Sequence, residues 1–219
     1  MKKCNLKQQA YQIIRRKIIN CEYQPGAFIN ENILLEDVPG SRTPIRDALS
    51  RLEQEKLLTV LPKKGILISS LSMGDIKLVY KTRLLLEPFA VLNCGNKLTE
   101  DFYIRMYEIF TGSLKDPAFS PEEEARYHEA DDEFHLAFIK ATDNPYFEQV
   151  YEQIHAQTHR VRVLTGNVSS GRLIPSGSEH LEILLSCLKK DWATASLNMR
   201  KHLSESQTSV LEQLSNLMV

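Results

Sequence analysis

Four residues with metal-binding side chains lie at spacings that would bring them together in a helical protein. Asp131 and His135 are four residues apart, so on one helix they share a face about one turn apart. His180 and His202 are 22 residues apart, and an antiparallel helical hairpin that turns near residue 191 would place them at the same height on neighbouring helices. One carboxylate and three imidazoles are typical ligands of a divalent transition metal, with positions left for water or a small ligand. The spacing predicts a metal site, and the metal stays open among Zn, Ni, Co, Mn and Fe.

The alternative interpretation of these histidines is purely structural. The chain has six histidines, and two of them can fall at mirror positions by chance. A histidine inside a core is more often hydrogen-bonded than bound to a metal. Phe134 and Phe138 indicate that this stretch lies near a core. Spacing alone therefore leaves both interpretations open.

The elements that must hold these residues are predicted to be helices. From residue 72 to the end the apolar pattern is helical, with no convincing strand. Start and stop signals such as Ser120-Pro121 and Asn144-Pro145 divide this region into six helices, over residues 72–93, 99–112, 120–142, 145–165, 178–190 and 191–217. Residues 166–178 are predicted to form a loop. This pattern is typical of an all-α bundle.

Residues 40–52 predict a helix whose exposed tip suits DNA. Ser41 or Thr43 can cap its N-terminus. Apolar residues recur at i, i+3, i+4 and i+7 and form one face: Ile45, Ala48, Leu49 and Leu52. Arg42, Thr43 and Arg46 lie at the tip, off that face, where arginine can read guanine edges and threonine can hold phosphates. The alternative is an ordinary amphipathic helix whose arginines are solvated.

The neighbouring segments favour DNA binding over that alternative. Residues 30–38 predict a short helix, and a turn at Pro39-Gly40 separates it from the next helix, as in a helix-turn-helix. Two β-rich runs flank a basic turn and predict a hairpin, the turn consisting of Pro62, Lys63, Lys64 and Gly65. A helix over about residues 6–20 and a short strand at residues 27–29 complete a winged helix-turn-helix.

Charge is distributed unevenly along the 219 residues. The net charge is −1, but residues 1–70 carry 12 basic and 7 acidic side chains, a balance of +5 that leaves −6 for the remainder. A basic module on an acidic body is expected of a DNA-binding domain joined to a sensing domain, and the modest +5 favours binding by two such modules. No apolar run is long enough to cross a bilayer, and the N-terminus leads into a polar helix instead of a signal sequence. The four cysteines lack metal-type spacing and are expected to be free thiols in a reducing cytoplasm.

The N-terminal region resembles a known family. Residues 41–49, followed by Arg51-Leu52-Glu53, closely resemble the recognition-helix signature of GntR-family transcription regulators. The turn at residues 23–26 and the wing at residues 62–65 fall where that family has them. The family usually has Gly-Val before the serine, whereas this chain has Pro39-Gly40. The resemblance implies a DNA-contacting surface made by Ser41, Arg42, Thr43, Arg46, Lys63, Lys64 and Gly65.

The C-terminal region resembles the FCD domain, the all-helical effector domain of the FadR-like group within that family. The resemblance is carried by residues 131–135, Asn144-Pro145, Glu179-His180 and residues 201–203. Members of this group often hold a metal with one Asp and three His, which fall position by position on Asp131, His135, His180 and His202. Asp132 is the rival for the carboxylate ligand, but it precedes His135 by three residues, so Asp131 is preferred.

A small carboxylate effector is expected at the open metal positions, with arginine sharing its charge. Arg83 resembles the arginine that has this role in the family, although a simple salt bridge to Glu87, one turn on, is the alternative. Arg162 is a second candidate because, reflected about the turn at residues 144–145, it falls near the level of His128.

The combined interpretation is a mainly α protein, with a winged helix-turn-helix over residues 1–70 and an all-helical effector-binding and dimerisation domain over residues 71–219. It predicts a cytoplasmic transcription regulator, a repressor, that binds a near-palindromic operator as a homodimer and answers to a small organic acid. It predicts no membrane partner. A metal-dependent hydrolase using the Asp/His₃ site is the alternative, disfavoured because a hydrolase has no need of a DNA-reading helix and no general base is placed beside the site. A regulator with a purely structural site is a third possibility.

Overall fold

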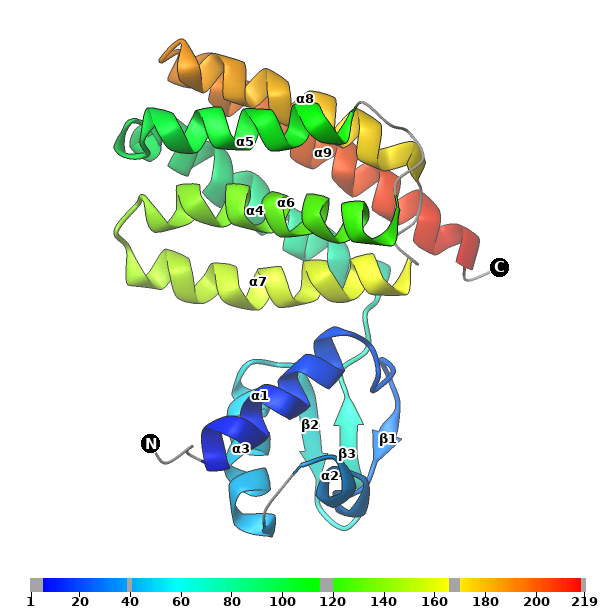
Figure 1. Cartoon of the computed structure of the whole chain (residues 1–219). Helices are drawn as coiled ribbons and strands as arrows, with labels where there is room; N and C mark the ends of the chain where they lie inside the picture. Colours follow the sequence, from blue (N-terminus) through cyan, green and yellow to red (C-terminus); the bar gives the residue numbers. More distant parts are fainter. Residues whose placement is uncertain (1–5, 39–40, 115–119, 166–169, 218–219) are drawn as a thin grey trace. The chain divides into compact units, whose positions relative to one another are not determined.

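The computed structural model describes residues 6–38, 41–114, 120–165 and 170–217 (Figure 1). These residues form two compact units. The first runs to Ser72 and includes His159–Leu164, and the second comprises Met73–Thr158 and the residues from Thr165 on.

The first unit is a winged helix-turn-helix, as predicted. Its elements in chain order are α1 (Leu6–Ile19), β1 (Phe28–Ile29), α2 (Glu31–Asp37), α3 (Arg42–Gln54), β2 (Leu58–Leu61) and β3 (Gly65–Ile68). The three strands form an antiparallel sheet in the order β1-β3-β2, with Phe28 opposite Leu67 and Leu58 opposite Ile68. The apolar face predicted for α3 is buried, together with Ile14, Ile18 and Leu34.

Local signals define the helix-turn-helix. The side chain of Asn30 caps α2 by accepting hydrogen bonds from the backbone N–H groups of Asn32 and Ile33, each at 3.0 Å. Ser41 is the N-cap residue of α3, although its side chain makes no capping hydrogen bond. The predicted turn at Pro39-Gly40 lies outside the described residues.

Glycine is required at one end of the wing. Gly65 has a φ of +112°, and a Cβ there would lie 2.8 Å from the carbonyl oxygen of Ile29, because β1 pairs with β3 at this point. Lys63 also has a positive φ, of 64°, and the N–H of Lys64 closes the turn by donating to the carbonyl of Leu61 at 3.0 Å. The turn therefore projects two lysines from the end of a short hairpin.

The second unit is an all-helical bundle, as predicted. Its described helices are α4 (Met73–Cys94), a short 3-10 helix η1 (Gly95–Lys97), α5 (Glu100–Ser113), α6 (Pro121–Lys140), α7 (Pro145–Leu164), α8 (Ser170–Leu188) and α9 (Trp192–Leu217). The last residues of α7, from His159 on, group with the first unit. The core is rich in aromatic rings, among them Phe110, Tyr127, Phe134 and Phe138. None of the helices in the described ranges is long and apolar enough to cross a membrane.

Two loop-and-turn predictions had different outcomes. The antiparallel hairpin of α8 and α9 turns near residue 191, as predicted: Lys190 has a positive φ of 58°, and the Asp191 carboxylate accepts from the backbone N–H of Thr194 at 3.0 Å.

The loop predicted over residues 166–178 is wrong within the described residues, because α8 already begins at Ser170. Its glycine and proline residues lower helix propensity, but tertiary packing outweighs that cost. A Cβ at Gly177 would lie 3.0 Å from Leu114 Cδ2, so a larger residue there would require that side chain to shift.

Candidate metal centre and nucleic-acid interface

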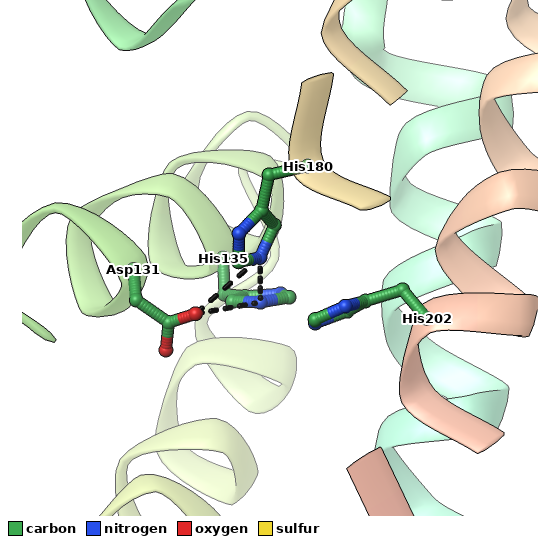
Figure 2. A group of neighbouring side chains, drawn as sticks. All are labelled: Asp131, His135, His180 and His202. Atoms are coloured by element: carbon green, nitrogen blue, oxygen red, sulfur yellow. Dashed lines mark hydrogen bonds and ion pairs between the residues drawn. The ribbon is translucent and has the colours of Figure 1, made fainter. Parts of the chain in front are cut away.

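The four predicted metal ligands converge in the helical bundle. Asp131 and His135 come from α6, His180 from α8 and His202 from α9, and one ligand atom from each lies within 4.8 Å of all the others. Figure 2 shows the four side chains turned toward a common centre. His180 Nε2 lies 3.3 Å from both His135 Nε2 and Asp131 Oδ1, and His135 Nε2 lies 3.7 Å from the same oxygen. The three histidines are buried, at 3% exposure or less.

These distances fit a single transition-metal ion. Ligand atoms bound to one ion at about 2.0–2.1 Å lie about 3.3 Å apart at tetrahedral angles. The contacts between His180, His135 and Asp131 are close to that spacing. Three nitrogens and one carboxylate oxygen are also the donor set that such ions prefer. The residues present therefore fit a divalent transition metal.

A partner on the other ring nitrogen fixes the orientation of each histidine. Nδ1 of His135 lies 2.6 Å from Glu87 Oε2, and Nδ1 of His202 lies 2.7 Å from Glu179 Oε2. An ionised carboxylate only accepts hydrogen bonds, so these two rings donate through Nδ1 and keep the Nε2 lone pair free for an ion. Nδ1 of His180 lies 3.2 Å from the Tyr127 hydroxyl.

Neighbouring charges and hydrogen bonds keep the carboxylates of Glu87 and Glu179 ionised. Burial alone would raise the pKa of Glu87, but the charges of Arg83 and His135 outweigh it and lower that pKa to about 2. Burial is likewise outweighed at Glu179, where hydrogen bonds from His202 and Arg172 lower the pKa to about 2. Burial, followed by the charges of the neighbouring histidines and arginines, lowers the pKa of His180 well below its usual value. A neutral His180 imidazole is the form that binds metal.

Asp132, the rival carboxylate, and Arg83, a predicted effector-binding residue, each have a partner other than the four clustered residues. Asp132 lies 3.0 Å from His155 Nε2, outside the cluster. Arg83 is buried, and its Nε donates to Glu87 at 2.6 Å, so the salt bridge considered as the alternative is present. Arg162 belongs to the segment that groups with the first unit, and its role at the site stays a prediction.

The sequence did not predict a role for Arg172, and it indicated Glu179 only as part of the resemblance to the FCD domain. Arg172 donates to both carboxylate oxygens of Glu179, at 2.8 and 2.7 Å, and thereby braces the carboxylate that holds His202. The two residues are seven apart, two turns of α8, which is a signal only once residues 170–178 are known to be helical. The role of Tyr127 could not be predicted from the sequence, because its contact with His180 depends on how two separate helices pack.

The predicted DNA-contacting residues lie on the surface of the first unit. Arg42, Thr43 and Arg46 are exposed at the start of α3, and Ser41 precedes them. Arg46 Nε lies 3.4 Å from Oε1 of the partly exposed Glu31. The wing presents Lys63 and Lys64 exposed and Gly65 partly exposed. The surface thus consists of one basic helix tip and one basic turn.

Comparison with known proteins identifies two family models in the chain. Residues 6–68 match the model described as bacterial regulatory proteins, gntR family, and residues 78–205 match the FCD domain. The HTH-type transcriptional repressor RspR of Escherichia coli (strain K12) is 25% identical over 205 residues, which cover 93% of this chain and 88% of that protein.

Solved structures share the fold. The E. coli protein McbR/YncC has a TM-score of 0.79 at 18% identity, and the match covers 96% of this chain and 99% of that one. The Zn²⁺-bound FCD domain of TM0439, a putative transcriptional regulator, has a TM-score of 0.56 at 20% identity, over 67% of this chain and 98% of that one. The family models and the curated relative are thus those of transcription regulators.

Proposed function

Since the chain belongs to the GntR family of bacterial regulatory proteins and carries an FCD domain, we propose that it is a repressor controlled by a small carboxylate at a metal site. In this proposal residues 1–70 bind DNA, and residues 71–219 bind the effector and dimerise, in the cytoplasm. The observation that carries the effector part is the convergence of Asp131, His135, His180 and His202.

The DNA-binding half of the proposal is supported by the exposed tip of α3. Two such helices, one from each subunit, would enter successive major grooves of a near-palindromic operator about one helical turn apart. Arg42 and Arg46 have the chemistry to read guanine, while Thr43 and the wing lysines have the chemistry to hold phosphates. Repression is supported by the similarity to RspR, a transcriptional repressor that matches this chain over 88% of its own length.

The sensing half is supported by charges around the cluster. Asp131, His135, His180 and His202 would hold the ion, which when bound would supply a Lewis-acidic charge for a carboxylate ligand. Arg83 is buried, and its charge reaches His180, as does that of Arg172. Because Glu87 and Glu179 pair with these two arginines, the ion would supply most of the positive charge that a carboxylate ligand meets at the site.

The metal-dependent hydrolase is not supported. Family and relatives are transcription regulators. The carboxylates that lie next to the histidines, Glu87 and Glu179, have a pKa of about 2 and are engaged by arginine and histidine. A carboxylate with so low a pKa is a poor general base at neutral pH.

Selection of random DNA duplexes by the purified chain tests the DNA-binding half. We expect enrichment of a near-palindrome with half-sites about 10 bp apart. Arg46→Ala should weaken binding to that duplex by about 10–100-fold with unchanged circular dichroism. Arg105→Ala, a half-exposed arginine on α5, is the matched control and should bind like wild type. Failure to enrich any sequence, or unchanged affinity of Arg46→Ala, would count against the proposal.

A screen of small carboxylates against the protein–operator complex tests the sensing half. A carboxylate that releases the operator from wild type should have no effect on the His180→Ala/His202→Ala double variant. Release that survives in the double variant would show that the ligand does not sit on the metal.

A further inference from the structure

A cavity of about 300 Å³ lies in the helical unit, lined by residues of η1, α5, α8 and the start of α9. Its volume is at the lower end of the range of small-molecule sites. None of the lining residues is one of the four clustered metal ligands. Leu188 is eight residues beyond His180 on α8, about 12 Å of helix, and Trp192 is ten residues before His202 on α9, about 15 Å of helix. The cavity is therefore separate from the metal site.

The buried part of the cavity wall is apolar. Tyr103 and Cys187 are 3% and 1% exposed, and the partly buried Leu98 and Leu188 lie beside them in the lining. The Tyr103 hydroxyl donates to the carbonyl of Gly95 at 2.6 Å, so this phenol adds no unsatisfied polar group. The inner part of the cavity therefore suits an apolar group.

Trp192 forms an aromatic side of the same cavity. Its ring lies against the backbone of Gly95, where a Cβ would come within 2.8 Å of two ring carbons. The centroids of the Trp192 and Tyr103 rings are 6.2 Å apart. Two aromatic rings offer a ligand a large apolar contact area. Trp192 is also the only tryptophan of the sequence, so tryptophan emission reports on this cavity alone.

Two side chains of opposite charge line the exposed part of the cavity. Lys190 belongs to the turn between α8 and α9, Glu100 is the first residue of α5, and both are exposed. Within the described ranges of the chain, neither forms an ion pair with the other or with a third residue. The exposed Asn96 adds an amide, which can both donate and accept hydrogen bonds. The opening thus offers a cation, an anion and an amide next to an apolar interior.

We propose that this cavity binds a free α-amino acid with an apolar side chain, as a second small-molecule site that needs no metal. Lys190 binds the carboxylate of the ligand, and Glu100 binds its ammonium group. The side chain of the ligand contacts Leu98, Leu188 and Trp192. A monocarboxylate would leave Glu100 without a cation, and an amine would leave Lys190 without an anion, whereas an amino acid carries both charges on one carbon atom. The site uses none of the residues on which the proposed function depends.

Titration of the tryptophan emission of the full chain tests the proposal, with L-leucine, L-methionine and L-phenylalanine as the probes. We expect a saturable change with at least one of them. Glycine, which has the same two charges and no side chain, should bind at least about 10-fold more weakly than that amino acid. Its deaminated and decarboxylated analogues, which keep the side chain and one charge each, should bind about fivefold or more weakly.

Substitution of the two charged residues tests the assignment of each charge. Lys190→Gln and Glu100→Gln should each raise the dissociation constant of the amino acid by about fivefold or more. Lys189→Gln and Glu108→Gln change exposed residues of the same types outside the lining, and they should bind within about twofold of wild type. Circular dichroism checks that the variants fold, and the analogues with one charge decide for any variant that does not.

The metal-site variant distinguishes this cavity from the effector site of the proposed function. His180→Ala/His202→Ala should bind the amino acid like wild type, because the cavity needs no metal. Loss of the emission change in that variant would place the ligand at the metal cluster and overturn the proposal. It is also overturned if none of the three amino acids gives a saturable change, or if Lys190→Gln and Glu100→Gln bind as tightly as wild type. Failure of the operator or metal tests would leave this binding unaffected, since it is measured without DNA and without added metal.

Discussion

At the scale of single residues, carboxylates from neighbouring helices hold two of the metal-binding histidines in place. Glu87 on α4 contacts His135 on α6, and Glu179 on α8 contacts His202 on α9. Such outer carboxylates orient a ligand and raise its basicity. The four ligands are therefore surrounded by an outer shell of carboxylates that orients two of the histidines.

Glu179→Gln tests that outer shell. The change removes a charge-assisted hydrogen bond to His202 and leaves the Arg172 cation without its carboxylate partner. We expect metal affinity to fall by about 10–100-fold, measured by competition with a chelator of known affinity. Glu182→Gln, an exposed glutamate one turn further along α8, is the matched control and should bind metal like wild type. Equal affinities in both variants would contradict the orienting role.

The residue types and spacings of the inner cluster were accessible from sequence, and the outer shell was not. The four-residue interval of Asp131 and His135 follows from helix geometry, and the mirror positions of His180 and His202 follow from the turn near residue 191. Glu87 approaches His135 only because α4 packs beside α6, across 48 residues of sequence. Contacts of that kind depend on packing angles that no local pattern encodes.

At the scale of elements, one carboxylate ties together the first helices of the N-terminal unit. Asp37, at the end of α2, lies 2.6 Å from Lys17 Nζ on α1 and accepts from the Tyr23 hydroxyl at 2.5 Å. A carboxylate at a helix C-terminus is unfavourable to the helix dipole, so its partners have to compensate. These hydrogen bonds, from Lys17 first and then Tyr23, lower the pKa of Asp37.

Asp37→Asn should therefore loosen α1 and α2 in a pH-dependent way. The folded-state pKa of Asp37 is below its unfolded value, so its stabilisation is present above about pH 4 and is lost as the pH falls through the folded pKa. We expect faster amide exchange in both helices near pH 7, corresponding to about 1 kcal/mol, and a smaller difference from wild type at acid pH. Hydrogen-exchange mass spectrometry of the full chain measures this. A pH-independent difference would assign the effect to packing instead of charge.

The wing is an element with an electrostatic prediction of its own. Lys63 and Lys64 are exposed in the turn between β2 and β3. If both meet phosphates, the Lys63→Ala/Lys64→Ala variant should reduce the slope of log affinity against log salt by about 2. Operator titrations at several salt concentrations give the slope, and a slope identical to that of wild type would remove the wing from the interface.

The helix starts predicted from the sequence were correct where capping signals were strong and wrong where helix propensity was low. Ser120-Pro121 marks a helix start, as predicted: Ser120 forms a capping box with Glu123, and α6 begins at the next residue. The start of α8 was misplaced because its serine, glycine and proline residues resemble a loop. There the packing of Leu173, Ser176 and Gly177 against the bundle decides the structure.

At the scale of the whole molecule, we expect the helical domain to convey effector binding to the DNA-binding domain. The bundle-facing side of α4 carries Arg83 and Glu87, beside His135. A ligand that binds one arrangement of α4 more tightly than another would bias the dimer toward that arrangement. The spacing of two recognition helices on an operator would respond to such a bias.

Elemental analysis of the purified, extensively dialysed chain tests the central claim most directly, with His180→Ala and His155→Ala measured beside wild type. His155 is the matched control because it lies on α7, paired with Asp132 and outside the cluster. The account predicts about one transition-metal ion per chain in wild type and in His155→Ala, and its loss in His180→Ala. No metal in wild type, or an equal amount in His180→Ala, would contradict it.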